Sequence, residues 1–513
     1  MAFLKILDHN GNKISQTALT GSFEGAGTGR RLNTWGMSTS GPNAAIFGSL
    51  STLRARSREL TRNNPLASGA IDSFVSNLIG SGISPRWQLD DIDLKKQIQE
   101  LWADSTEEID AAGLTDFYGL EAMVAHSVIE SGEVLVRFRP RLSEYGYAVP
   151  LQLQILEADH LDESFNTVLS NGNEIRMGIE FNRIGQKVAY HLFREHPGEF
   201  YHIKTNDRVR IPASEILHIG RPLRPGQIRY RPWLSSVIVR LHELDQYQDA
   251  ELVRKKSAAM FGGFITELPG DDTEFTPLGK VIKRDTSERD IVALEPGTFP
   301  ILPPGMDVRF SEPADVGGNY EKWIKQELRS IARGIGITYE QLTGDLSGVN
   351  YSSIRAGLIE FRRLCIMLQK QMIAFQFCGP VARRWLDTAV MSGALKIPDY
   401  RKNRRKYYRI KWRPDGFAWV DPEKDQKAEQ MAVRNGFKSR SQVVAELGHD
   451  IEMLDSEIAE DNKRADQLDL VFDSDPRKTA KTGTYQQTSE ENPSENTSQE
   501  ENKNEQTDTI ETD

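Results

Sequence analysis

An apolar seam over residues 350–378 constrains the fold of this chain more than any other feature. Its members alternate steps of four and three residues: Ile354, Leu358, Phe361, Cys365, Leu368, Met372 and Phe375. This spacing keeps the apolar side chains along one side of a helix that is about 43 Å long at 1.5 Å per residue. A seam of that length predicts large packing partners, and therefore a core in which several elements surround one long helix.

The composition is typical of a chain with a sizeable core. Its 513 residues leave room for roughly three domains or for one elongated subunit with several parts. Cys365 and Cys378 are too few for a disulfide framework or a thiolate zinc site, so we expect both to be small core residues. No apolar run approaches the eighteen or so residues of a membrane helix, and the start lacks a secretory signal. We therefore expect no membrane partner.

Much of the charge is concentrated in the tail. The net charge is −10, of which the last forty residues carry −6 and the rest of the chain −4. From residue 474 onwards the sequence is mostly Glu, Asn, Ser, Thr and Gln, and we expect it to be disordered. The nearly balanced body argues against a globally basic DNA-coating protein.

The pattern along the chain predicts an α+β fold. A helical pattern runs from Leu50 to Ile79 and is broken at residues 63–65, and another helix is predicted over 238–261. Strand patterns lie between these helices, at Val134–Phe138, Leu151–Leu156, Ile175–Phe181, Val188–Leu192 and Ile216–Ile219. Residues 20–50 are rich in Gly, Ser and Thr, which predicts an irregular arm.

Prolines, glycines and helix-capping residues mark the remaining elements. Seven prolines in 264–315 predict short strands and turns, and helicity resumes near residue 317. Further on, Asp421-Pro422 predicts a helix start, Ser439 with Gln442 a capping box, and Gly436 and Gly448 helix ends.

Enzymatic motifs are weak in this sequence. Gly279-Lys280 lacks the upstream glycine of a phosphate loop, and Ser347 has the wrong spacing for a nucleophile elbow. One group of potential metal ligands comprises His191, Glu195, His196, Glu199, His202 and Asp207. It could form a divalent site, but its spacing matches no zincin pattern, and polar residues around Pro197-Gly198 are typical of a solvated turn. We expect no catalytic residue, no metal and no cofactor.

A basic stripe is predicted on the helix that follows residue 317. At 100° per residue its four members lie within about 80° of one another: Lys322, Lys325, Arg329 and Arg333. The opposite arc is apolar and comprises Ile324, Leu328, Ile331, Ala332 and Ile335. The stripe could be an ordinary solvated face, or it could meet phosphates without reading sequence.

The densest basic segment is residues 401–413, with eight Lys or Arg and no acid. Tyr407, Tyr408 and Trp412 stand among these cations, as in a platform that stacks single-stranded nucleic acid. A strand pattern explains the segment nearly as well, with the aromatic side chains in the core and the cations facing an acidic neighbour. Both interpretations stay open.

Three long motifs point to a known family. They are RNNPLASGAIDSFVSNLIGSGISPRWQ at 62–88, GIGITYEQL at 334–342 and GDLSGVNYSSIRAGLIEFRR at 344–363. Together they resemble the lambda-type family of tailed-bacteriophage portal proteins, and the similarity extends from about Arg54 to Leu470. The resemblance implies α+β subunits with wing, stem, clip and crown parts, whose long helices surround a central channel for double-stranded DNA in a ring of about twelve copies.

The resemblance also divides the chain into parts. Residues 1–49 would be a flexible N-terminal arm, 50–237 together with the long helix at 351–392 the wing, and 474–513 the disordered acidic tail. The stem would consist of the helices at 238–262 and 316–337, with the clip at 263–315 between them. The tunnel loop would be 338–350 and the crown 393–473.

In the family, the tunnel loop projects into the channel at its narrowest level. The matching residues that would line the channel here are Gln341, Thr343, Gly344, Asp345, Ser347, Gly348 and Asn350, and the basic stripe would be a second channel surface. The loop could also be a plain helix connection, in which Gly344 ends one helix and Asn350 begins the next. Both interpretations can hold together.

The sequence therefore predicts a portal protein that is not an enzyme. The implied partners are further copies of the chain, double-stranded genomic DNA, the terminase large subunit, a major capsid or scaffolding protein, and a head-completion or adaptor protein. The expected location is the portal vertex of the virion, and the host cytoplasm during assembly. Two alternatives stay open: a metal-dependent DNA-processing hydrolase that uses the His191 to Asp207 group, and a monomeric DNA-binding scaffold.

Overall fold

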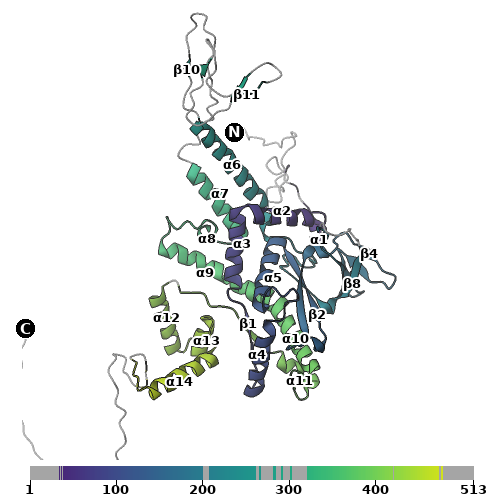
Figure 1. Ribbon diagram of the computed structural model, residues 1–513, viewed down its shortest axis with the longest axis vertical. Coiled ribbons are helices and arrows are strands. Elements are labelled where there is room, and N and C mark those ends of the chain that lie inside the picture. Colours follow the sequence, from purple (N-terminus) through teal and green to yellow (C-terminus); the bar gives the residue numbers. More distant parts are fainter. Residues whose placement is uncertain are drawn as a thin grey trace, which may run out of the picture. The chain divides into compact units, whose positions relative to one another are not determined.

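The computed structural model describes two compact units of the chain (Figure 1), which divide after Val420. The described residues are 38–199, 207–260, 320–419 and 421–472, the single residues 34, 36, 475 and 477, and four short strands between 265 and 302. Nearly all of the predicted tail and clip, and the predicted arm before residue 38, therefore lie outside the described residues.

The first unit begins with three helices: α1 (Pro42–Ile46), α2 (Leu50–Asn63) and α3 (Pro65–Leu78). The predicted break between α2 and α3 is confirmed, because Asn64 accepts hydrogen bonds from the backbone of Leu66 and Ala67 and so caps α3. The end of the predicted irregular arm is instead helical at α1. Asn43 of α1 donates to the carbonyl of Gly226 at 3.0 Å and accepts from the amide of Ile228 at 2.9 Å. These two long-range bonds fix α1 to the loop before α6.

Two antiparallel sheets form the strand part of this unit. The first has the order β3 (Leu151–Glu157), β2 (Glu133–Pro140), β9 (Ile216–Gly220). The second is a meander of β4 (Thr167–Val168), β5 (Glu174–Arg176), β6 (Ile179–Phe181), β7 (Lys187–Phe193) and β8 (Arg208–Pro212). The predicted single strand Ile175–Phe181 was wrong: Met177 and Gly178 have φ of 49° and 82°, and this left-handed turn reverses the chain.

Helix α5 (Phe117–Ser131) packs against the first sheet. Helix α4 (Ile92–Thr106) packs against β1 (Ser84–Trp87), which forms a small sheet with β14 (Ile410–Arg413). Fully buried aromatic rings meet between these elements and the long helix: Trp87, Trp102, Phe117, Phe377 and Trp385. The core therefore joins residues that are almost three hundred positions apart in the chain.

The long helix is confirmed, but it changes its winding. It consists of α9 (Tyr351–Leu368), a π-helix over Gln369–Cys378, and α10 (Gly379–Ser392). Hydrogen bonds from i to i+5 put more residues into each turn than in an α-helix, so the buried side no longer follows the seven-residue repeat. Phe375 is consequently 75% exposed, whereas Phe377 is buried. The predicted last position of the seam was wrong, while Phe361, Cys365, Leu368 and Met372 are buried as predicted.

The remaining elements of the first unit are α6 (Ile238–Met260), α7 (Tyr320–Ile335), α8 (Tyr339–Thr343), α11 (Tyr400–Tyr407), and four single-turn helices at Ser143–Tyr145, Ala158–His160, Ala213–Glu215 and Trp233–Ser236. Between α6 and α7, the predicted short strands are β10 (Ile265–Thr266), β11 (Val281–Arg284), β12 (Asp290–Val292) and β13 (Ile301–Leu302). Cys365 and Cys378 are buried free thiols, as predicted. In the described ranges, no helix has the length and apolar character needed to cross a membrane.

The second unit consists of α12 (Pro422–Arg434), α13 (Arg440–Glu446) and α14 (Ile451–Gln467). The predicted boundaries are confirmed: Asp421 caps α12, Ser439 and Gln442 form a capping box, and Gly436 and Gly448 have φ of 73° and 87°. Its interior is small, since Val444 and Ala465 are the only buried residues among those described in 421–472.

Candidate functional site

The loop between α7 and α9 has ordered ends. Thr338 and Gln341 form a capping box at the start of α8, and Gly344, with φ of 69°, ends that helix. Asn350 caps α9 by accepting a hydrogen bond from the amide of Ser353 at 2.8 Å. Gly344 and Asn350 therefore have the helix-ending and helix-starting roles that the sequence predicts.

Asp345 organises the centre of this loop. Its carboxylate accepts from the amide of Ser347 at 3.0 Å, from the hydroxyl of Ser347 at 2.5 Å and from the hydroxyl of Tyr339 at 3.1 Å. The bonds from Ser347, followed by the one from Tyr339, lower the pKa of Asp345. Thr343 accepts from the amide of Asp345 at 3.1 Å. Hydrogen bonds among its own residues and to Tyr339 therefore fix the conformation of the loop.

The tip of the loop is open to solvent. Leu346 is 63% exposed, and Ser347, Gly348 and Asn350 are exposed beside it. Gln341 and Thr343 are half-buried because their side chains make hydrogen bonds at the start and the end of α8. Of the predicted loop residues, those from 346 to 350 can meet a partner, while Gln341, Thr343 and Asp345 hold the loop in shape.

The structure brings the basic stripe and the loop together. Arg329 lies over the ring of Tyr339, with 5.6 Å from the guanidinium carbon to the ring centroid, and Lys325 has a favourable electrostatic interaction with Asp345. On the opposite arc of α7, Leu328, Ile331, Ala332 and Ile335 are buried as predicted, and Ile324 is half-buried.

Three of the four stripe cations already have a partner in the chain. Besides the stacked Arg329, Lys325 pairs with Glu321 at 2.8 Å, which raises the pKa of Lys325, and Arg333 pairs with Glu360 of α9 at 3.2 Å. Lys322 is exposed. Sequence reasoning missed Tyr339 and Glu360, because their roles depend on how α8 and α9 fold back on α7.

The predicted metal-ligand group is not one cluster. His191 contacts the buried Glu180 at 3.2 Å, whereas His196 contacts Glu157 at 3.3 Å, and His202 lies outside the described residues. Glu157, Asp159 and His196 do converge within 4.8 Å.

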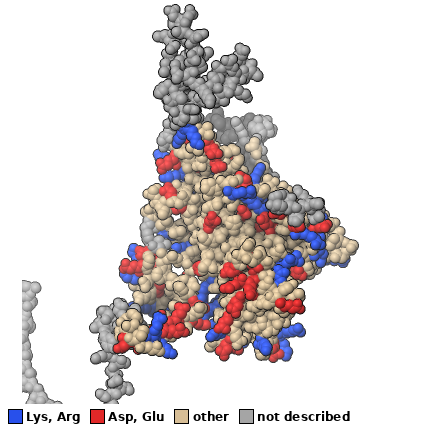
Figure 2. All heavy atoms as spheres, viewed as in Figure 1, with Lys and Arg blue, Asp and Glu red and all other residues tan. Residues whose placement is uncertain are grey.

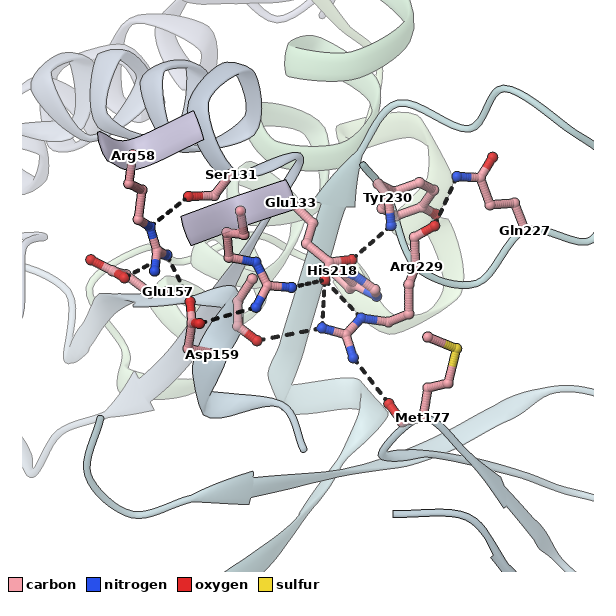
Figure 3. Close-up of polar contacts among 12 residues, drawn as sticks. Arg58, Ser131, Glu133, Glu157, Asp159, Met177, His218, Gln227, Arg229 and Tyr230 are labelled. Carbon is pink, nitrogen blue, oxygen red and sulfur yellow. Dashed lines mark hydrogen bonds and ion pairs between the residues drawn. The ribbon is translucent and has the colours of Figure 1, made fainter. Parts of the chain in front are cut away.

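An arginine side chain already lies between the carboxylates of Glu157 and Asp159 (Figure 3). The guanidinium of Arg58 lies 2.6 Å from Glu157 and 2.7 Å from Asp159, so a metal ion would have to displace it. The described geometry therefore does not favour a divalent site here.

Comparison with known proteins decides the family. Residues 28–369 match the family model for "Phage portal protein, lambda family", which covers well over half of the chain. The chain belongs to the lambda family of phage portal proteins. It is 30% identical over 477 residues to the probable portal protein of Halomonas phage phiHAP-1, with 89% of each chain covered. It is also 22% identical over 465 residues to portal protein B of Escherichia phage lambda, with 83% of this chain and 86% of that one covered.

Solved particle structures give a looser likeness to this portal protein. A chain in the neck of the native GTA particle, computed with C12 symmetry, has 16% identity and a TM-score of 0.39, and the match covers 77% of this chain and 93% of that one. A chain in the virion of the native gene transfer agent (GTA) particle gives a TM-score of 0.40, with 79% and 95% covered.

A buried ionic network stabilises the first unit of this portal protein (Figure 3). The carboxylate of Glu133, at the start of β2, accepts hydrogen bonds from Arg229 at 2.7 Å, His218 at 2.9 Å and the amide of Tyr230 at 3.0 Å. Arg54 of α2 approaches it at 3.4 Å. These contacts join α2, β2, β9 and the loop before α6.

Burial and the neighbouring charges have opposite effects on the pKa of Glu133 in this network. Burial would raise the pKa of Glu133, but the charge of Arg229 and the hydrogen bond from His218 outweigh it and hold that pKa far below its usual range. Burial lowers the pKa of His218 to about 4. Glu133 is therefore charged and His218 neutral at pH 7.

The basic segment 401–413 has its aromatic side chains in the core and its cations outside. Tyr407, Tyr408 and Trp412 are half-buried and pack against the main core, as the strand interpretation predicts. Residues 400–407 are helical rather than extended. Since the rings are engaged in the core, the segment is a poor stacking platform for nucleic acid.

Proposed function

We propose that about twelve copies of this chain form a ring at one capsid vertex and enclose the channel through which double-stranded DNA is packaged and ejected. The observation that carries this proposal is membership of the portal family over residues 28–369, a range that includes the tunnel loop and the basic stripe. A closed ring gives every copy the same two neighbours and the same position around the DNA.

The tunnel loop is the proposed point of closest approach to DNA. Its ends are capped and its centre is held by Asp345, so Leu346 to Asn350 would form a firm, exposed tip. The tip carries no cation, and weak attraction to phosphates suits a surface past which DNA must slide.

The basic stripe is the proposed second channel surface. Its cations can meet phosphates of any sequence. Because Lys325, Arg329 and Arg333 also contact Glu321, Tyr339 and Glu360, their attraction for DNA would be moderate. This arrangement supports guidance of the duplex rather than tight binding.

The proposed partners beyond DNA follow from the same role. The clip at 263–315 would dock the terminase large subunit during packaging and a head-completion or adaptor protein afterwards, and the wing would meet the major capsid or scaffolding protein. The chain would assemble in the host cytoplasm and remain in the virion. We propose a structural role without catalysis or cofactor.

The first experiment is negative-stain electron microscopy with native mass measurement on the purified chain. Rings with a hole wide enough for duplex DNA are expected, and the mass gives the number of subunits. A homogeneous monomer with strongly salt-dependent DNA binding would favour the scaffold alternative instead. Nuclease turnover with Mg²⁺ or Zn²⁺ that is lost on His196→Ala would favour the hydrolase.

Reversal of the stripe tests the channel assignment. We predict that Lys325→Glu with Arg329→Glu leaves ring assembly intact but reduces the DNA packaged by at least about tenfold, because a negative wall repels phosphates. The measurement is nuclease-protected DNA in a packaging reaction with the cognate motor. Glu144→Lys with Asp104→Lys, which also changes two exposed charges, is the control. Normal filling of heads by the stripe variant would remove the stripe from the mechanism.

A further inference from the structure

The long helix has an exposed side opposite its buried seam. At 100° per residue, four exposed residues lie within about 60° of one another and roughly opposite Phe361: Ile359, Arg363, Ile366 and Lys370. The π-helix adds Phe375, which is 75% exposed. Arg363 and Lys370 form no ion pair with any described residue. These five residues, which we call the outer face of the long helix, are therefore available to a partner.

Helix α3 has an exposed side of a different kind, which we call the outer face of α3. Its four exposed members lie within about 60° of one another and roughly opposite Phe74: Pro65, Gly69, Asp72 and Ser76. All four side chains are small, and a Cβ added at Gly69 would meet no atom within 4 Å. Asp72 forms no ion pair with any described residue. The outer face of α3 is therefore shallow, and its charge is negative.

The two outer faces point in opposite directions. Helix α3 and the long helix pack against each other: the ring centroids of Phe74 and Phe361 are 5.3 Å apart, and Gln369 donates to the carbonyl of Leu78 at 3.0 Å. Each outer face lies on the side of its own helix that is turned away from this contact. Figure 1 shows α3 in the middle of the first unit beside α9, and in Figure 2 the middle of the same view carries few charged side chains. The faces therefore lie on opposite sides of the packed pair of helices.

We infer that the outer face of the long helix in one copy packs against the outer face of α3 in the adjacent copy. This inference rests on the proposed ring. A head-to-tail ring joins two different patches of the same chain at every contact, and the two patches must lie on opposite sides of the subunit. The packed pair of α3 and the long helix meets this condition, because each copy offers one outer face to each of its two neighbours.

The two faces complement each other in shape and in charge. Ile359 and Ile366 are 41% and 39% exposed, and they can enter the shallow surface that Gly69 leaves on α3. Arg363 and Lys370 have the charge opposite to that of Asp72, which favours this pairing and its register. Phe375 supplies a large ring of the kind that anchors protein interfaces. The contact also explains why a long helix with a buried seam has apolar side chains on its other side.

DNA is a weaker candidate for the outer face of the long helix. A duplex would offer phosphates to Arg363 and Lys370, but no apolar surface to Ile359, Ile366 and Phe375, which stand on the same face. A second copy offers both an acidic group and a shallow surface of small side chains. It also covers the outer face of α3, which DNA would leave open.

Changes of shape in the full-length chain test the contact from both sides. Gly69→Gln puts a long side chain on the outer face of α3, and Phe375→Ala removes the ring from the outer face of the long helix. Each should raise the concentration needed for half-maximal ring assembly, read from native mass, by about tenfold or more. The urea midpoint of the monomer should not fall in either variant, because Gly69 faces open space, glutamine is the better helix former, and Phe375 is exposed. Ala103→Gln on the exposed side of α4 and Met391→Ala, at a side chain that is 79% exposed, are the matched controls.

Charge exchange tests the pairing of the two faces. Arg363→Asp and Asp72→Arg should each raise the half-maximal concentration by about threefold or more, because each puts like charges across the contact. The double variant restores opposite charges, so its value should lie within about threefold of the unaltered chain. A double variant that assembles worse than both single variants would overturn the pairing.

The outcomes separate this inference from the ring itself. A chain that stays monomeric without substitutions overturns both proposals. Rings that form equally well in every variant overturn the contact between the two outer faces alone. Reduced DNA retention by Arg363→Asp with unchanged assembly would assign the outer face of the long helix to DNA, and intact Phe375→Ala rings that fail to enter capsids would assign it to a capsid protein. Both of these results also overturn the contact.

Cysteine cross-linking gives a further measurement that does not depend on assembly strength. Cys365 and Cys378 are buried, so new surface cysteines react against a quiet background. Asp72→Cys combined with Arg363→Cys, treated with a short bis-maleimide, should give a ladder of linked oligomers on a denaturing gel, and each single variant at most a dimer. The two positions lie on opposite sides of the packed helices, so the ladder reports links between neighbouring copies. A double variant with no ladder, from rings seen by microscopy, would overturn the contact.

Discussion

At the residue scale, the network around Glu133 is the strongest determinant of stability that no sequence motif indicates. Glu133 is one acid among many in the sequence, and nothing in its neighbourhood marks it. Its importance comes from Arg54, Arg229 and His218, which stand on three other elements and converge on one buried carboxylate. Sequence reasoning predicts the strand that begins there, but it cannot predict contacts between residues that are about one hundred positions apart.

We predict that Glu133→Gln lowers the free energy of unfolding by about 3 kcal/mol, because it leaves the buried Arg229 without its counter-charge. The native pKa of Glu133 is depressed, so its contribution is present above its ordinary pKa of 4.5 and is lost as the pH falls below that value. Urea unfolding at pH 7 measures the difference. Glu157→Gln, at a carboxylate that is 56% exposed, should cost less than about 0.5 kcal/mol. Equal losses in the two variants would contradict the network's role.

His218 gives a pH dependence of its own. Its pKa of about 4 lies below its ordinary value of 6.5, so the unfolded chain binds a proton that the folded chain does not. Stability should therefore decrease as the pH falls from 7 to 5, by about 2 kcal/mol from this residue. Thermal unfolding across that range should show a smaller decrease for His218→Gln than for the unaltered chain. The exposed His242 is the matched position, and His242→Gln should keep the full pH dependence.

At the element scale, the long helix shows what a repeat can and cannot predict. The seven-residue spacing correctly predicts the buried positions Phe361, Cys365, Leu368 and Met372, while Ile354 and Leu358 at the start of the seam are half-buried. It fails at Phe375, because the π-helix rotates the following residues relative to the seam. The residue identities do not reveal this change, since it depends on what the helix packs against. Local signals were more dependable, as the caps at Asn64, Asn350 and Ser439 show.

The two phenylalanines on this segment provide the test. Phe377 is buried and stacks on Phe117 with ring centroids 5.4 Å apart, so Phe377→Ala should cost about 3–5 kcal/mol of unfolding free energy. Phe375→Ala should cost less than about 0.5 kcal/mol, because that ring is 75% exposed. Chemical denaturation of both variants below the assembly concentration makes the comparison. The reverse order would mean that the α-helical seam continues through Phe375.

At the scale of the whole molecule, the two units differ in how much stability their own cores can provide. The first has an extensive core of large rings and aliphatic side chains, which the long seam in the sequence predicts. In the second unit the ends of α12 and α13 were predicted from their capping residues, yet what those helices pack against cannot be read from caps. Phe437 is 81% exposed, and Met431 and Met453 are 64% and 65% exposed. Apolar side chains that are this open in a small unit indicate that its folding depends on contacts beyond its own residues.

We therefore predict that residues 421–472, expressed alone, do not unfold cooperatively. About fifty residues that bury two side chains cannot offset their conformational entropy, whereas contacts in the assembled chain can. Circular dichroism of the isolated segment should show a gradual loss of helix on heating. In the full-length protein, limited proteolysis should cut this segment rapidly in monomers and slowly in rings. A sharp melting transition of the isolated segment would show that its helices suffice, and the exposed apolar residues would then be free to bind a partner without being needed for the fold.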